Sequence, residues 1–101
     1  MQWQIIALSN GYYKMKNRTS GLVIDGKGLT TAGSALGQWS DVTSNNLEWQ
    51  ITALGNGYYK IENHTSGLVV DGKGATTSSS ASGQWSDVTS TNLEWQISVL
   101  P

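Results

Sequence analysis

Two aspartates stand in positions where a carboxylate can meet a ligand. Asp25 and Asp71 each end a short apolar segment, and Gly-Lys-Gly follows each of them. A carboxylate can accept two hydrogen bonds from neighbouring hydroxyl groups of a sugar, and glycines let a ligand approach the backbone closely. The alternative is that each aspartate caps its own turn through an Asx hydrogen bond. The residues alone leave both readings open.

Two tryptophans could supply the apolar surface of a site that contains these aspartates. Trp39 and Trp85 both stand in the segment Gly-Gln-Trp-Ser. An indole face stacks well on the C–H face of a pyranose ring, although packing in a core is the alternative role. If Leu36 points inward, strand alternation turns Trp39 outward and Gln38 inward. Gln38 and Gln84, which directly precede the tryptophans, are counted with the candidate sites.

Amide side chains complete each candidate site. Asn46 and Asn92 both offer a donor and an acceptor, which suits a hydroxyl group that is itself both. The alternative is a plain turn residue, in Ser-Asn-Asn-Leu and Ser-Thr-Asn-Leu. Asp41 and Asp87 are further candidates for the rim of the same sites, or ordinary loop residues. The predicted sugar-binding residues are therefore Asp25, Gln38, Trp39, Asn46, Asp71, Gln84, Trp85 and Asn92.

The same residues argue against an enzyme. The only histidine, His64, is replaced by Arg18 at the corresponding place in the chain, and a shared general base would not change type between near-copies. There is no cysteine nucleophile, and the few acids lie in predicted loops. The Asp-Gly-Lys-Gly segments lack the remainder of a phosphate-binding loop or of a calcium loop. We therefore expect binding without catalysis, and neither a metal nor another cofactor.

Composition narrows the class of protein further. The 101 residues carry a formal net charge of −1, and 13% of them are charged. This gives no electrostatic signature of nucleic-acid binding or of an anionic membrane surface. Without cysteines the chain forms no disulfide framework, zinc finger or iron–sulfur site. No segment is predicted to insert into a membrane, and the first residues do not resemble a signal peptide, so the compartment stays open.

An internal repeat decides how these residues are arranged. Trp-Gln-Ile occurs at residues 3, 49 and 95, and 35 of the 46 positions agree between residues 3–48 and 49–94. No linker separates the copies. We therefore predict a single unit over residues 1–101, made of a terminal strand of a partial lobe (1–8), repeat 1 (9–54) and repeat 2 (55–101).

Each repeat reads as four short strands. Asn-Gly at residues 10–11 and 56–57 is a strong hairpin signal between aromatic and β-branched runs. Short strands are also predicted at residues 22–25 and 37–39, and at the equivalent places in repeat 2. No window has the 3.6-residue period of a helix, so none is expected beyond a turn. Four strands per repeat fit a β-propeller blade or a β-trefoil lobe.

The motifs choose between these architectures. The order Asn-Gly-Tyr-Tyr-Lys, Asn-x-Thr-Ser-Gly-Leu-Val-x-Asp-Gly, Gly-Gln-Trp-Ser and Asn-Leu-Glu-Trp-Gln-Ile resembles the ricin-type β-trefoil lectin repeat, also called carbohydrate-binding module family 13. One departure is that Leu47 and Leu93 stand where the family usually has Gln. The resemblance implies an all-β trefoil that binds galactose-type sugars or plant and algal polysaccharides, with the aspartates and Asn46 and Asn92 contacting sugar. Modules of this family are often secreted.

Two repeats leave a trefoil one lobe short. A pair of lobes would expose apolar barrel residues and open strand edges. Trp3, Trp49 and Trp95 are expected in that barrel core. We therefore predict self-association, in which three chains of 10.9 kDa supply six lobes for two trefoils, a native mass near 32.7 kDa. The alternatives are an open array, a propeller-like ring, or a natural or engineered structural fragment that binds no sugar.

Overall fold

The Asn-Gly hairpin signals correspond to the two longest strand pairs. In the computed structural model, which describes residues 3–72 and 82–97, β1 (Trp3–Ala7) pairs with β2 (Tyr13–Asn17), and β5 (Trp49–Ala53) pairs with β6 (Tyr59–Asn63). Each pairing is antiparallel and covers five residue pairs. The Asn10 side chain accepts a hydrogen bond from the backbone N–H of Tyr12 at 3.1 Å, which fixes the first of these turns.

Shorter hairpins follow each long one along the chain. These are β3 (Val23–Asp25) with β4 (Gly37–Trp39), and β7 (Val69–Asp71) with β8 (Gly83–Trp85). A single turn of 3-10 helix follows each short hairpin, η1 (Asn45–Leu47) and η2 (Thr91–Leu93). The described ranges contain no other helical segment, so the prediction of no helix beyond a turn is confirmed there.

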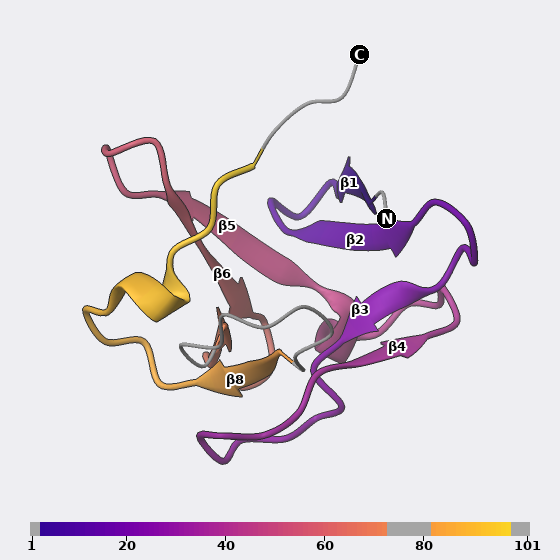
Figure 1. The fold of residues 1–101 in the computed structure, drawn as a ribbon. Coiled ribbons are helices and arrows are strands. Elements are labelled where there is room, and N and C mark those ends of the chain that lie inside the picture. Colours follow the sequence, from indigo (N-terminus) through magenta and orange to yellow (C-terminus); the bar gives the residue numbers. More distant parts are fainter. Residues whose placement is uncertain (1–2, 73–81, 98–101) are drawn as a thin grey trace.

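All eight strands join in one strongly bent sheet. Its order is β4-β3-β2-β5-β6-β7-β8, with β1 on the far edge of β2 (Figure 1). β2 is connected to β5 through the pair Tyr13 and Trp49, and Trp95 pairs with Tyr59 of β6 in the same way. The sheet therefore repeats its own geometry after 46 residues, as the sequence does.

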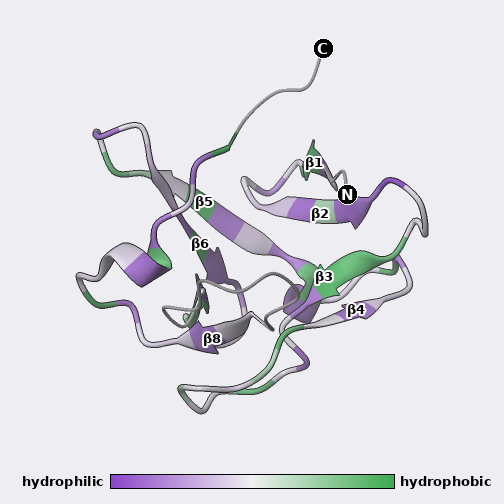
Figure 2. Ribbon diagram, viewed as in Figure 1, coloured by the Kyte–Doolittle hydropathy of each residue, from purple (hydrophilic) through white to green (hydrophobic). Residues whose placement is uncertain are grey.

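The core lies where the two repeats meet. Met15, Trp49, Ile61 and Val70 are buried together, and Ile24, Leu36, Ile51 and Trp95 pack against them. Figure 2 shows hydrophobic residues along β3, whereas hydrophilic residues interrupt β2, β5 and β8. No helix of the described ranges is long and apolar enough to span a bilayer.

The three Trp-Gln-Ile tryptophans differ in burial, which corrects one expectation. Trp49 is fully buried, and its indole Nε1 donates to the carbonyl of Ile24 at 3.1 Å. Trp95 is half-buried and donates to the carbonyl of Val70 at 3.0 Å. Trp3, expected in the core, is 42% exposed. The physical reason is that no preceding repeat lies over Trp3 in the described part of the chain.

Candidate functional site

The predicted residues of repeat 1 gather around one hollow. Asp25, Trp39 and Asn46 line an open hollow of about 550 Å³, together with Gln38 and Lys27. They come from three places, namely the end of β3, the end of β4 and the turn η1. The antiparallel pairing of β3 with β4 sets Asp25 opposite Gly37, so the aspartate and the tryptophan lie on neighbouring strands.

Repeat 2 has an equivalent hollow with a different border. Asp71, Trp85 and Asn92 line a space of about 370 Å³, and Gly33 of repeat 1 also borders it. A Cβ atom added to Gly33 would lie 3.6 Å from the Trp85 ring, and the φ of +91° at Gly33 suits glycine. A loop of the preceding repeat therefore borders one side of this hollow.

Each aspartate ends a strand, and Asp25 is also held by its own turn. Asp25 and Asp71 are almost fully buried. Oδ1 of Asp25 accepts a hydrogen bond from the backbone N–H of Lys27 at 2.7 Å, where Lys27 has a φ of 60°. The Asx turn considered as an alternative role is therefore present in repeat 1. It uses Oδ1, and the same side chain still borders the hollow.

The asparagines are fixed through their backbone. The Ser44 hydroxyl accepts from the N–H of Asn46 at 3.3 Å, and Ser90 holds Asn92 in the same way. The carbonyl of Asn46 accepts from the N–H of Gly26 at 3.0 Å. Its side-chain amide stays on the hollow, close to Gly28, where an added Cβ would lie 3.3 Å from Nδ2.

The two tryptophans turn outward, as strand alternation predicts for Trp39. Trp39 is 60% exposed and Trp85 is 43% exposed. An exposed indole beside a carboxylate and an amide is a suitable platform for an amphipathic ring. Lys27, which the sequence reasoning did not include, joins them in repeat 1. Its place in Asp-Gly-Lys-Gly, two residues after the aspartate, is the signal that points to it.

The glutamines correct two expectations. Gln38 is exposed on the hollow instead of pointing inward. Gln84 is fully buried, so it does not border the hollow of repeat 2. Its Nε2 donates to the carbonyls of Gly26 and Ala35, at 3.2 and 3.1 Å. The reason for the difference is that repeat 1 covers Gln84, whereas no described segment covers Gln38.

The rim aspartates are tied to lysines and lie outside both hollows. Asp41 forms ion pairs with Lys14 at 2.7 Å and with Lys16 at 2.8 Å, and Asp87 pairs with Lys60. Hydrogen bonds from Lys14 and Lys16 hold the pKa of Asp41 below its usual value. These exposed carboxylates therefore brace the β2 and β6 strands.

The leucines that depart from the lectin pattern are structural. Leu47 and Leu93 are almost fully buried in the turns η1 and η2. They seat each turn against the sheet, next to the asparagine that faces the hollow. No group of three or more His, Cys, Asp or Glu side chains suited to a metal ion occurs in residues 3–72 and 82–97.

Comparison with known proteins assigns the family. The model of ricin-type β-trefoil lectin domain-like proteins matches residues 1–85 and again residues 45–101. The chain belongs to this family. No curated protein sequence matches it. The all-β fold of trefoil lobes, predicted from the resemblance of the motifs, is thereby confirmed.

Solved trefoil structures superpose closely on this family member. The designed three-fold symmetric protein ThreeFoil is 32% identical with a TM-score of 0.93, and the match covers 98% of this chain and 72% of ThreeFoil. An exo-β-1,3-galactanase from Clostridium thermocellum is 31% identical with a TM-score of 0.91, over 98% of this chain and 22% of the enzyme.

A lectin structure shares the fold at lower identity. The Polyporus squamosus lectin, solved with the epitope Neu5Acα2-6Galβ1-4GlcNAc, is 21% identical with a TM-score of 0.80. That match covers 93% of this chain and 34% of the lectin. Membership of the ricin-type lectin-like family supports carbohydrate binding as the general function.

Proposed function

We propose that this protein binds galactose-type sugars, or sugars of plant and algal polysaccharides, through one shallow site per repeat. The observation that carries the proposal is that two hollows, 46 residues apart in sequence, each gather an aspartate, an asparagine and an exposed tryptophan. The galactanase similarity and the galactose in the epitope of the Polyporus lectin favour this sugar class.

Each side chain has a distinct role in the proposed site. The carboxylate of Asp25 or Asp71 accepts from sugar hydroxyls, and Asn46 or Asn92 both donates and accepts. Trp39 or Trp85 stacks on the apolar face of the ring. No catalytic step is proposed, because His64 is replaced by Arg18 in repeat 1 and borders neither hollow.

Assembly would multiply these weak sites. We propose that three chains supply six repeats for two trefoils, because six is the smallest number that both two repeats per chain and three per trefoil divide. Six sites on one particle bind a polysaccharide through effective concentration. A second candidate function, a scaffold that binds no sugar, is favoured by the exposure of Trp3 and Gln38, since these residues suit assembly and need no ligand.

The decisive experiment is a glycan array read with the intact protein and with Asp25→Asn, Asp71→Asn and the double variant. Asparagine keeps an oxygen for the N–H of Lys27, so the turn at Asp25 is preserved. We expect each single variant to retain binding through the other repeat and the double variant to lose it. Asp41→Asn is the matched control, because Asp41 lies outside both hollows.

Circular dichroism of each variant separates loss of the site from loss of the fold. A double variant that is folded and binds galactosides as well as the parent would overturn the proposed sites. A folded, assembled parent that binds no glycan on the array would favour the scaffold function.

A further inference from the structure

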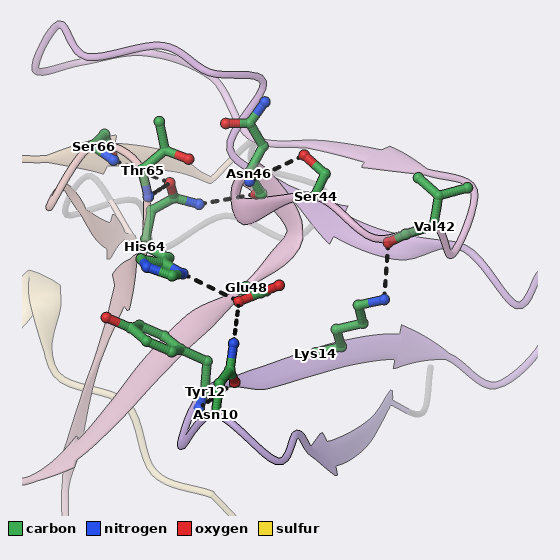
Figure 3. A network of polar contacts seen from close by, with 11 residues as sticks. Asn10, Tyr12, Lys14, Val42, Ser44, Asn46, Glu48, His64, Thr65 and Ser66 are labelled. Atoms are coloured by element: carbon green, nitrogen blue, oxygen red, sulfur yellow. Dashed lines mark hydrogen bonds and ion pairs between the residues drawn. The ribbon is translucent and has the colours of Figure 1, made fainter.

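Repeat 1 and repeat 2 meet at a set of polar contacts, all of which lie among the described residues. The backbone N–H of His64 donates to the carbonyl of Glu48 at 2.9 Å, and His64 Nδ1 lies 3.1 Å from Glu48 Oε1. The Tyr12 ring stacks on the His64 ring with centroids 3.8 Å apart. Asn10 Nδ2 donates to the same Glu48 oxygen at 2.8 Å (Figure 3). We call this contact between the repeats the inner joint.

Two amide side chains complete the inner joint. Asn63 Nδ2 donates to the carbonyl of Asn46 at 3.0 Å. Gln84 Nε2 donates to the carbonyl of Gly26, and the backbone of Gln84 exchanges two hydrogen bonds of 2.7 Å with the segment around Gly33. Repeat 1 therefore contributes backbone carbonyls, the Glu48 carboxylate and the Tyr12 ring, and repeat 2 contributes amide and imidazole groups.

The residue types on each side of the inner joint occur a second time in the chain, on the face of each repeat that points away from the other repeat. On repeat 1, the residues equivalent to Asn63, His64 and Gln84 are Asn17, Arg18 and Gln38. On repeat 2, the residues equivalent to Tyr12, Asn46 and Glu48 are Tyr58, Asn92 and Glu94. Exposure follows the difference, since Gln84 is fully buried and Gln38 is exposed, while Tyr58 is 43% exposed and Tyr12 is half-buried.

We propose that repeat 1 of a second copy, separated from that copy's own repeat 2, docks on the repeat 2 face by reproducing the inner joint, with Arg18 taking the place of His64 against Glu94 and Tyr58. The inference rests on the proposed assembly and names its contact. Arginine suits the place better than histidine between two chains, because its guanidinium is always charged, pairs with a carboxylate and stacks on an aromatic ring.

Backbone contacts extend the copied joint. Asn17 donates to the carbonyl of Asn92, as Asn63 does to Asn46, and Gln38 donates to the carbonyl of Gly72. Gln38 thereby leaves the hollow of repeat 1, as Gln84 has left that of repeat 2. The repeat 2 positions equivalent to Gly33–Ala35 lie outside the described residues.

At such a joint, two equivalent segments would compete for one place, namely the segment around Trp95 of one copy and β1 of the other. Trp3 and Trp95 hold equivalent positions, so only one of them fits against Val70 when two copies meet. β1 is held to β2 by five residue pairs, whereas Trp95 is held by one bridge to Tyr59. Trp3 of the incoming copy therefore replaces Trp95, and its exposed indole is buried on docking.

The first test reverses the charges at the joint. Native mass is measured by light scattering for the full chain, Arg18→Glu, Glu94→Arg and the double variant, over a range of protein concentrations. Each single reversal should weaken assembly roughly tenfold or more, and the double variant should recover most of the loss. A parent chain of 10.9 kDa at all concentrations, or reversals without effect on the native mass, would overturn the proposal.

The second test compares two tryptophans of one motif. Trp3→Ala should weaken assembly, whereas Trp95→Ala should leave assembly within a few-fold of the parent. The opposite order would contradict the replacement of Trp95 by Trp3. Glycan binding is measured on the same variants, and Arg18, Glu94 and Trp3 lie outside both hollows. Loss of assembly with retained monomer binding is thus distinct from failure of the sugar sites.

Discussion

The two repeats have nearly the same sequence, yet equivalent residues lie in different environments. Gln84 is buried and bonded to repeat 1, while Gln38 borders an open hollow. Trp49 is fully buried, while Trp3 is 42% exposed. The shared motifs do not account for these differences, because both glutamines stand in Gly-Gln-Trp-Ser and both tryptophans begin Trp-Gln-Ile. They arise from the neighbouring repeat, which covers Gln84 and Trp49, whereas no described segment covers Gln38 or Trp3.

A second difference between the repeats is a substitution in the sequence, next to the rim aspartates. In repeat 1, Asp41 is held by Lys14 and Lys16. In repeat 2, Lys60 pairs with Asp87 but Glu62 stands where Lys16 stands. The comparison thus separates two effects, namely what a neighbouring repeat does to identical residues and what one substitution does within the same geometry.

The largest expected effect on stability concerns two tryptophans that make the same hydrogen bond but differ in burial. Trp49 and Trp95 each donate one indole hydrogen bond to a strand carbonyl, but only Trp49 is fully buried. Trp49→Ala should cost about 3–5 kcal/mol of unfolding free energy, and Trp95→Ala roughly 1–3 kcal/mol. Urea unfolding at one low protein concentration measures both. Equal losses would show that the neighbouring repeat adds nothing to this position.

A smaller effect is expected for the glutamines. Gln84→Ala removes two hydrogen bonds to repeat 1 carbonyls and should cost about 1–2 kcal/mol. The loss is moderated because the Gln84 Oε1 atom has no hydrogen-bond partner among the described residues. Gln38→Ala in the monomer should change stability by less than about 0.5 kcal/mol. The comparison fails if the two variants unfold at the same urea concentration.

The sequence predicts the candidate sites better than it predicts the contacts between repeats. Asp25, Trp39 and Asn46 come together because each stands at a strand end or turn that the motif fixes locally. The roles of Gln84 and Trp3 depend on whether a neighbour is present, which repeated motifs do not reveal. Lys27 was missed because its position depends on a left-handed turn, with a φ of 60°.

Acid should weaken the inner joint. Burial disfavours the ionised form of Glu48, but hydrogen bonds from Asn10 and His64 and the charge of His64 outweigh it and lower its pKa. A lowered folded-state pKa contributes stability that is present above the unfolded value and is lost as the pH falls through the folded value. Unfolding free energy should therefore drop by about 1 kcal/mol as the pH falls through the acid range below about 4.5.

Glu48→Gln provides the control for this pH dependence. The amide oxygen can still accept from Asn10, but it carries no charge for His64. The variant should be less stable than the parent at neutral pH and should approach it in acid. A constant difference between the two proteins over the whole range would show that ionisation of Glu48 does not stabilise the joint.

The smallest effect concerns the rim, where one substitution should make repeat 2 resemble repeat 1. Burial raises the pKa of Glu62, and the charge of Asp87 and a hydrogen bond with it act in the same direction, while Lys60 opposes them. Glu62→Lys should form the ion pair that Lys16 makes with Asp41 and stabilise the fold by up to about 1 kcal/mol. Because a raised folded-state pKa gives stability that is lost as the pH rises, the gain should be larger at pH 7 than at pH 4.

Lys16→Glu is the matched opposite change. It should place a second carboxylate beside Asp41 in repeat 1, as Glu62 lies beside Asp87 in repeat 2. The free energy of unfolding should fall by an amount similar to the gain from Glu62→Lys, and the fall should be larger at low salt than at high salt. If Glu62→Lys and Lys16→Glu shift stability in the same direction, the rim charges do not account for this difference between the repeats. Opposite shifts of similar size would show that the two rims share one geometry and differ only in their charges. The difference between Gln38 and Gln84, by contrast, comes from their neighbours and not from their own residue type.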